Sequence, residues 1–163
     1  MESAAERRLF WGTAGAVVVS DFITKALAES LLARRLPLAV IGDFVQLRLV
    51  YNQGAAFGLD VGENSRWVFF GLAIIALVVL GSMVRSTRAG DWFRLLALSL
   101  VCGGAAGNLI DRLAVGSVVD FVDVYWRAHH FWAFNVADSA ITIGVIVMIL
   151  DMIGANRHAS TTV

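Results

Sequence analysis

The chain contains few cysteines, prolines and charged residues, and each shortage excludes a structural or functional feature. It holds one cysteine, Cys102, so no disulfide can form within the chain. Its one proline, Pro37, lies outside the long apolar runs, which can therefore form uninterrupted helices. Charged residues make up 16% of the chain, against roughly 25% in a soluble domain. The 13 basic and 13 acidic residues balance, so the net charge does not indicate a nucleic-acid partner.

Apolar side chains are abundant instead. Hydrophobic residues make up 58% of the 163 residues, and the mean hydropathy is +0.74. A helix needs about 20 apolar residues to cross the core of a bilayer. Stretches of about this length occur at about 9–31, 67–84, 93–113 and 134–153. We therefore expect an all-α membrane protein with four transmembrane helices, in which residues 1–163 form a single domain.

The orientation of these spans follows weakly from the positive charges. The arginines flanking the four spans divide six against six between the two sides of the membrane. The loop at 84–94 is the shortest and contains Arg85, Arg88 and Arg94, and short loops carry the most weight in the positive-inside rule. We therefore place this loop and both termini in the cytoplasm.

The segment at about 36–59 then lies outside the cytoplasm and has a strand-like pattern. Val45, Leu47 and Leu49 alternate with the residues between them, which is the period of a β-strand. Asn52-Gln-Gly54 follows as a turn. The sequence predicts a small extracytoplasmic β-rich segment lying on the membrane surface.

Four aspartates, Asp21, Asp111, Asp120 and Asp138, lie in or beside the apolar stretches. A charge at membrane depth costs on the order of 3 kcal/mol by insertion scales, so such a residue is by default a candidate for function. Asp120 and Asp138 stand at the edges of neighbouring predicted helices. Their side chains can face each other there across an apolar cleft.

Two carboxylates in one dry site suit acid–base catalysis. They cannot both ionise cheaply, so one pKa rises and the pair shares a proton. One member can then act as general base on a water while the other protonates the attacked carbonyl, as in aspartic peptidases. Asp138 lies roughly 6 Å inside the predicted helix, which we interpret as evidence against a simple capping role. We interpret Asp123 as a solvated loop charge.

The first and third spans carry further polar residues. Asn108, Asp111 and Arg112 share one helical face, just after a run of small residues at 103–107 that permits close helix packing. Asp111 is either functional or, with Arg112, a helix-end charge that reaches the membrane interface. Asp21 and Lys25 are four residues apart, a spacing suited to a buried ion pair. Such a pair is either structural or a substrate contact.

Other catalytic chemistries lack their motifs. The sequence contains no His-Glu-x-x-His zinc motif and no Gly-x-Ser-x-Gly nucleophile elbow. His129 and His130 are adjacent and make a poor metal pair, so we interpret them as loop residues at the membrane interface. We expect neither a metal nor a cofactor.

Five blocks of sequence together resemble the bacterial lipoprotein signal peptidases (signal peptidase II). The blocks occur in the family's order and spacing, and the resemblance extends from about residue 10 to residue 153. They are Asp21-Phe-Ile-Thr-Lys25, Asn52-Gln-Gly-Ala-Ala-Phe-Gly58, Gly103-Gly-Ala-Ala-Gly-Asn-Leu-Ile-Asp-Arg112, Val118-Val-Asp-Phe121 and Phe134-Asn-Val-Ala-Asp138.

The resemblance implies an intramembrane aspartic endopeptidase of the bacterial inner membrane, with its active site near the extracytoplasmic face. Its substrates would be prolipoproteins cleaved just before a diacylglyceryl-modified cysteine, and the inhibitor globomycin is expected to bind. The resemblance implies that Asp120 and Asp138 are catalytic and leaves a supporting role for Asp111. Roles in orienting the site or binding substrate fall to Asn108, Arg112, Asn135, Asn52, Gly54, Asp21 and Lys25, and structural roles to Gly104 and Gly107.

Two other functions are also consistent with aspartates placed in apolar helices. A small four-helix proton-relay transporter would also place carboxylates inside the membrane, although no repeated or broken spans are visible. A lipid-binding scaffold would tolerate replacement of the aspartates by asparagine. We expect a monomer, because one cleft per four-helix unit is sufficient for the peptidase.

Overall fold

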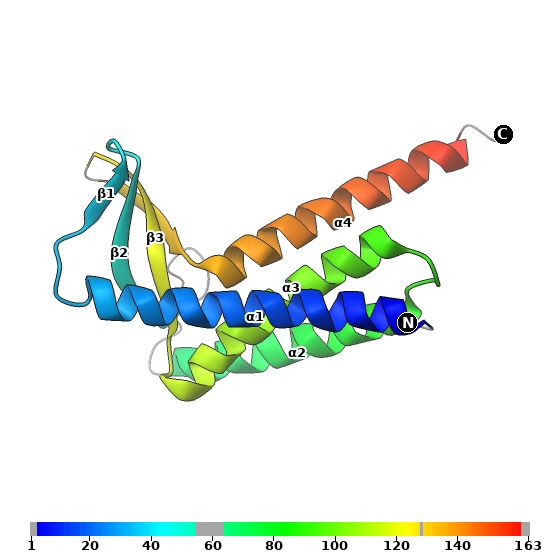
Figure 1. Ribbon diagram of the computed structural model, residues 1–163, viewed down its shortest axis with the longest axis horizontal. Helices are drawn as coiled ribbons and strands as arrows, with labels where there is room; N and C mark the ends of the chain where they lie inside the picture. The colour runs from blue at the N-terminus through cyan, green and yellow to red at the C-terminus, as the bar shows by residue number, and fades with distance from the viewer. Residues whose placement is uncertain (1–2, 55–63, 128, 161–163) are drawn as a thin grey trace.

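The computed structural model describes residues 3–54, 64–127 and 129–160, which form long helices and one small sheet (Figure 1). In chain order the elements are α1 (Ala4–Leu32), β1 (Leu38–Ile41), β2 (Val45–Asn52), α2 (Ser65–Ser86), α3 (Trp92–Ala114), β3 (Val118–Trp126), β4 (His129–Phe134) and α4 (Val136–Ser160).

Within the described residues, three helices are long and apolar enough to cross a membrane. They are Ser65–Ser86 in α2, Trp92–Ala114 in α3 and Val136–Gly154 in α4. The first two match the predicted spans to within two residues at each end. The third begins two residues later than predicted, because Phe134 is the last residue of β4.

The span expected at about 9–31 corresponds to α1, but α1 is not apolar enough to confirm it as a membrane span. This helix has 29 residues, or about 44 Å, which is long enough to cross a bilayer. It is not among the apolar helices because charged residues interrupt it, notably Asp21 and Lys25. Both side chains are buried, at 2% and 5% exposure. Exposed Phe22 and Leu27 cover other parts of the same helix.

α3 packs closely against α1 and α4 through glycines, as the small residues at 103–107 predict. A Cβ added at Gly104 would collide with the backbone oxygen of Ala137 in α4. A Cβ added at Gly107 would lie 2.8 Å from Oδ2 of Asp21 in α1. Because neither neighbour can move aside cheaply, these two positions require glycine at this helix spacing.

At the other end of the bundle, Phe10, Val84, Leu95 and Leu98 form a small buried core that joins α1, α2 and α3. Cys102 is partly buried and packs against this core. Cys102 is therefore a packing residue of the helix bundle.

The sheet has the order β1-β2-β3-β4, and neighbouring strands are antiparallel. β2 confirms the strand predicted from the alternation at 45–50, whereas β3 and β4 were not predicted. The run at 118–124 is rich in valine, which favours strands, but its pairing partners lie far away in the sequence. The protein is therefore mostly helical with a small antiparallel sheet. Residues 55–59 of the predicted β-rich segment lie outside the described residues.

The sheet stands at one end of the helices in Figure 1. The start of α1, the connection between α2 and α3, and the last turns of α4 lie toward the other end. α4 diverges from the other helices along its length. The end of α3 and the start of α4 therefore lie near the strand β3 of the sheet.

Candidate active site

Asp120 lies in β3, and not at a helix edge as predicted, and its side chain is 1% exposed. Its Oδ1 accepts a hydrogen bond from Nδ2 of Asn135 at 2.7 Å. Its Oδ2 accepts one from Nδ2 of Asn52 at 3.1 Å. Two amides, one from β2 and one from the residue before α4, therefore hold the carboxylate from two sides.

Asp138 lies in the first turn of α4 and forms a reciprocal cap with Asn135. Oδ1 of Asn135 accepts the N–H of Asp138 at 2.9 Å, and Oδ2 of Asp138 accepts the N–H of Asn135 at 3.3 Å. Our interpretation that Asp138 lies too far inside the helix to cap it is wrong, because α4 begins at Val136. The other oxygen, Oδ1, accepts a hydrogen bond from Nδ2 of Asn108 at 2.7 Å.

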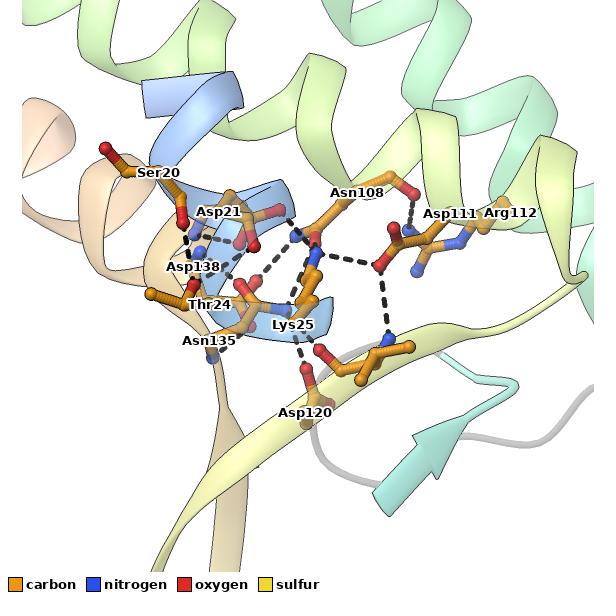
Figure 2. Close-up of polar contacts among 12 residues, drawn as sticks. Ser20, Asp21, Thr24, Lys25, Asn108, Asp111, Arg112, Asp120, Asn135 and Asp138 are labelled. Carbon is orange, nitrogen blue, oxygen red and sulfur yellow. Dashed lines mark hydrogen bonds and ion pairs between the residues drawn. The ribbon is translucent and has the colours of Figure 1, made fainter. Parts of the chain in front are cut away.

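The two asparagines link the carboxylates into one network (Figure 2). Nδ2 of Asn135 donates to Oδ1 of Asn108 at 3.2 Å as well as to Asp120. Asn108 in turn donates to Asp138. A continuous chain of hydrogen bonds therefore runs from Asp120 through both amides to Asp138.

Lys25 lies beside Asn108, between the carboxylates of Asp21 and Asp111 (Figure 2). Its Nζ is 2.5 Å from Oδ2 of Asp21 and 2.7 Å from Oδ2 of Asp111, and it donates to Oδ1 of Asn108 at 3.1 Å. The predicted Asp21–Lys25 ion pair is confirmed. Asp111 is a second partner of the lysine, so its charge is paired within the protein.

Each of these two carboxylates also accepts a hydrogen bond from the backbone next to Asp120 or Asp138. Oδ1 of Asp21 accepts the N–H of Ala137 at 2.9 Å, next to Asp138. Oδ2 of Asp111 accepts the N–H of Val119 at 3.2 Å, next to Asp120. The cluster of Lys25, Asp21 and Asp111 thus connects α1 and α3 to the segments that contain Asp120 and Asp138.

Arg112 lies on the same face of α3 as Asn108, as predicted. Its Nη1 donates to the backbone oxygen of Asn108 at 3.2 Å. The backbone oxygen of Arg112 accepts a hydrogen bond from Nε of Arg66 at 3.2 Å. The guanidinium of Arg112 therefore stays beside the end of α3.

Burial raises the pKa of Asp120 from 3.8 to about 7. Loss of hydration is the largest cause, and the negative charge of Asp138 adds to it. The hydrogen bonds from Asn52 and Asn135 act in the opposite direction, since they favour the ionised form. Asp120 is therefore poised to gain or lose a proton near neutral pH.

Both aspartates line one cavity of about 1140 Å³ between the sheet and the start of α4. Asn52 and Gly54 lie at the end of β2, where Oδ1 of Asn52 accepts the N–H of Gly54 at 3.0 Å and leaves Nδ2 for Asp120. Most of the remaining wall is apolar: Val50, Val118, Phe131, Trp132, Ala133, Phe134, Ile141 and Ile143. The wall residues of β4 were not predicted, and the cluster of aromatic residues at 131–134 is the sequence signal for them.

The residues interpreted as loop positions lie in the sheet. Asp123 belongs to β3 and is 0% exposed, so its interpretation as a solvated charge is wrong. His129 and His130 belong to β4. Nδ1 of His130 lies 2.7 Å from Oδ2 of Asp123. Among the described side chains, no three His, Cys, Asp or Glu residues gather as a metal site.

Apolar helices and a pair of aspartates that line one cavity, one buried and one partly buried, are the features of a membrane aspartic peptidase. The chain belongs to the signal peptidase II family, whose family model matches residues 13–154. This membership does not favour the transporter or the scaffold.

The chain is also similar in sequence to named relatives and in structure to solved proteins. The chain is 42% identical to a lipoprotein signal peptidase of Pseudomonas fluorescens over 89% of this chain and 87% of that one. It is 38% identical to a lipoprotein signal peptidase of Geobacter metallireducens over 94% and 95%. A solved bacterial membrane enzyme superposes with a TM-score of 0.79 at 32% identity, covering 90% of this chain and 88% of the other. A second has a TM-score of 0.75 at 34% identity, with coverages of 88% and 91%.

Proposed function

We propose that this protein removes signal peptides from diacylglyceryl-modified prolipoproteins, with Asp120 and Asp138 as its catalytic dyad. Membership of the signal peptidase II family supports the reaction. One observation supports the assignment of the dyad: both carboxylates line the same cavity and are joined through Asn108 and Asn135.

In this mechanism the dyad carries one proton between its two members. The ionised member takes a proton from a water, whose oxygen attacks the carbonyl carbon of the scissile peptide. The protonated member gives its proton to the carbonyl oxygen, which produces a neutral tetrahedral intermediate. Collapse of the intermediate breaks the C–N bond: the leaving nitrogen takes a proton from the protonated member, and a hydroxyl of the intermediate gives its proton to the ionised member. The products are a carboxylic acid and an amine, and the dyad again carries one proton. The pKa of about 7 for Asp120 supports a singly protonated pair at neutral pH.

Asn108 and Asn135 orient the dyad in this proposal. Each donates a hydrogen bond to one catalytic carboxylate. These bonds fix the direction of one oxygen of each carboxylate, and both residues line the cavity. Lys25 sets the direction of the Asn108 amide, and Asp21 and Asp111 hold Lys25 and the adjacent backbone. Arg112, Asn52 and Gly54 line the cavity where the substrate backbone would pass.

The apolar cavity wall supports a lipid-modified substrate. A buried acyl chain contributes about 0.8 kcal/mol per CH₂ group. Acyl chains held against α4 and the aromatic residues of β4 would place the adjacent peptide bond at the dyad, so remote binding energy would serve positioning.

We propose that all four helices cross the bacterial inner membrane and that the chain works as a single-domain monomer. Asp21 and Lys25 bring their charges into the bundle as a pair, which makes an embedded α1 tolerable. The sheet and the dyad would face the extracytoplasmic side, while both termini and the α2–α3 connection would face the cytoplasm. Three arginines at 84–94 support this orientation. A globomycin-type inhibitor is expected to occupy the same cavity.

The decisive experiment is cleavage of a diacylglyceryl-modified prolipoprotein by the purified full-length protein in detergent. Asp120→Asn and Asp138→Asn are expected to remain folded and to lose activity by at least about a thousandfold. Asp111→Asn is expected to retain measurable activity, and Asp43→Asn, in the exposed β1–β2 turn, to match the wild type.

The same substrate without its lipid is the second arm, and it is expected to be cleaved far more slowly. An active, folded Asp120→Asn or Asp138→Asn variant would contradict the dyad. Failure of the folded wild type to cut the lipidated substrate would contradict the proposed reaction itself.

A further inference from the structure

Asp123 is a fully buried carboxylate on the face of the sheet opposite to Asp120. The two residues lie three positions apart in β3, and side chains along a strand alternate between its faces. Val50, Val118 and Trp132 share the cavity with Asp120. Asp123 is not among the residues that line this cavity, so the proposed reaction leaves it without a role.

One oxygen of Asp123 contacts the strands on both sides. Its Oδ2 accepts a hydrogen bond from Nε2 of Gln46 at 2.6 Å. The same Oδ2 lies 3.2 Å from Nε of Arg48, as an ion pair without hydrogen-bond geometry. It also lies 2.7 Å from Nδ1 of His130. Gln46 and Arg48 belong to β2 and His130 belongs to β4, so Asp123 joins three strands.

These contacts occur where the strand pairing is irregular. Between β2 and β3, Leu47 pairs with Val122 but Val50 pairs with Asp120, so three steps along β2 match two along β3. Arg48 lies inside this irregular stretch. A slip of one residue in this pairing would turn every later side chain to the other face of the sheet.

The pairing of β3 with β4 contains a second irregularity. Val124 pairs with Trp132 and Tyr125 pairs with His130, so one step along β3 matches two along β4. His130 therefore lies at the edge of this bulge, and its ring also stacks on Tyr125 with centroids 5.8 Å apart.

Both registers determine which groups reach Asp120. Asn52, which donates to Oδ2 of Asp120, lies at the end of β2 beyond the first irregularity. Asn135, which donates to Oδ1, directly follows β4 beyond the second. A change in either register would move one of these two amides away from the carboxylate.

We propose that Asp123 is a positioning residue for Asp120: by contacting Gln46, Arg48 and His130 it fixes both strand registers. Fixed registers keep Asn52 and Asn135 on the two oxygens of Asp120. One buried oxygen can serve this role because it contacts side chains of both neighbouring strands. This inference rests on the proposed catalytic role of Asp120.

The test compares Asp123→Asn with Asp43→Asn, the same substitution at an exposed turn position. The full-length variants would cleave a diacylglyceryl-modified prolipoprotein peptide, with kcat and KM measured over a pH range of about 5.5 to 9, which brackets the pKa of about 7 for Asp120. Asp123→Asn is expected to lower kcat by about tenfold or more and to change KM by less than about threefold, because misplaced reacting groups slow the chemical step. Asp43→Asn is expected to match the wild type.

The pH profile separates positioning from general stability. Removal of amide hydrogen bonds from an ionised carboxylate raises its pKa. The alkaline limb, which reports loss of the shared proton, is therefore expected to move to higher pH in Asp123→Asn. A purely structural role would lower the thermal unfolding temperature and leave the alkaline limb of the folded fraction unchanged.

His130→Phe is the second variant, in case Asp123→Asn does not fold. It keeps an aromatic ring on Tyr125 and removes the nitrogen that contacts Asp123. It is expected to shift kcat and the alkaline limb in the same direction by a smaller amount. Wild-type kcat and alkaline limb in the variants that fold would overturn the positioning role.

Asp120→Asn is run in parallel to separate the two proposals. If it is folded and inactive while Asp123→Asn behaves like the wild type, only the positioning role fails. If Asp120→Asn cleaves the substrate, the proposed dyad fails, and the positioning role fails with it.

Discussion

Lys25 in α1 donates a hydrogen bond to the side-chain oxygen of Asn108 in α3 at 3.1 Å, across 83 positions of sequence. This bond decides the direction of the Asn108 amide. Its oxygen faces the lysine, so its nitrogen faces Asp138, to which it donates at 2.7 Å. A cation on the first helix thereby sets the hydrogen bonding of a carboxylate on the last helix.

Lys25→Met is expected to cost both stability and activity. The substitution leaves Asp21 and Asp111 without their shared cation, and breaking a buried ion pair in this way costs roughly 3–5 kcal/mol. Thermal unfolding and cleavage rate are the measurements. The double variant Lys25→Met/Asp111→Asn removes one unpaired charge and is expected to recover part of the unfolding temperature. A single variant as stable and active as the wild type would contradict the role of the cluster.

Asn135→Asp is expected to separate catalysis from helix capping. Aspartate caps helices about as well as asparagine, so the start of α4 should persist. However, a carboxylate oxygen would replace the amide nitrogen that lies 2.7 Å from Oδ1 of Asp120. We expect kcat/KM to fall by at least about a hundredfold. The unfolding temperature should also fall, because the buried carboxylate would face the oxygens of Asn108, Val119 and Asp120 without a donor between them. Asn135→Ala removes the cap without adding a charge, and loss of the cap should cost about 1 kcal/mol of stability. Full activity of Asn135→Asp would exclude the proposed orienting bond.

The stability of the wild type is expected to fall between about pH 4 and pH 7 because of Asp120. Its pKa is about 7 in the folded protein, against an ordinary value of 3.8 that applies to the unfolded chain, so in this window the folded state binds the extra proton. Stability therefore decreases as pH rises through the window and levels off above it. At about 1.4 kcal/mol per pKa unit, the effect amounts to no more than about 4 kcal/mol.

Asp120→Asn lacks this titration, so it should gain stability relative to the wild type as the pH rises. The measurement is the difference in unfolding temperature between the two proteins from about pH 5 to about pH 8, the range in which the Asp120 proton is lost. A difference that stays constant over this range would show that Asp120 does not titrate there.

Asn52→Ala is expected to move the alkaline limb of the pH–rate profile to higher pH. Asn52 donates to Oδ2 of Asp120 and so favours its ionised form, which keeps the pKa of Asp120 lower than burial alone would. Without this bond the dyad should hold its proton to higher pH, and the maximal rate should fall. Gln53→Ala is the neighbouring control, because this exposed residue also lines the cavity. An unchanged limb in Asn52→Ala would contradict the contribution of this bond.

Gly104→Ala is expected to destabilise the helix bundle. The added Cβ would collide with the backbone oxygen of Ala137, and overpacking of this kind costs roughly 1–3 kcal/mol. Gly15→Ala and Gly81→Ala are matched controls, since nothing lies within 4 Å of a Cβ at either position. Both controls should be as stable as the wild type or slightly more stable, by up to about 1 kcal/mol. Equal unfolding temperatures for Gly104→Ala and the controls would show that α3 and α4 can separate cheaply.

The sequence by itself determined the features that depend on local composition and spacing. Apolar length predicted α2, α3 and most of α4, and the alternation at 45–50 predicted β2. The four-residue spacing of Asp21 and Lys25 predicted their ion pair, because residues at this spacing are neighbours on a helix. The cost of burying a charge singled out Asp120 and Asp138, and the two residues do line one cavity.

Only the tertiary structure decided what depends on contacts with other segments of the chain. Asp123 looks like a solvated loop charge until β2 and β4 bring Gln46 and His130 to its carboxylate, 77 and 7 positions away in sequence. The strand around Asp120 is stable because β2 and β4 pair with it, and no local pattern encodes that pairing. The capping role of Asp138 depends on β4 ending at Phe134, which delays the helix start by two residues. In each case the energy of the residue is set by hydrogen bonds and burial supplied by other segments, which the local sequence does not contain.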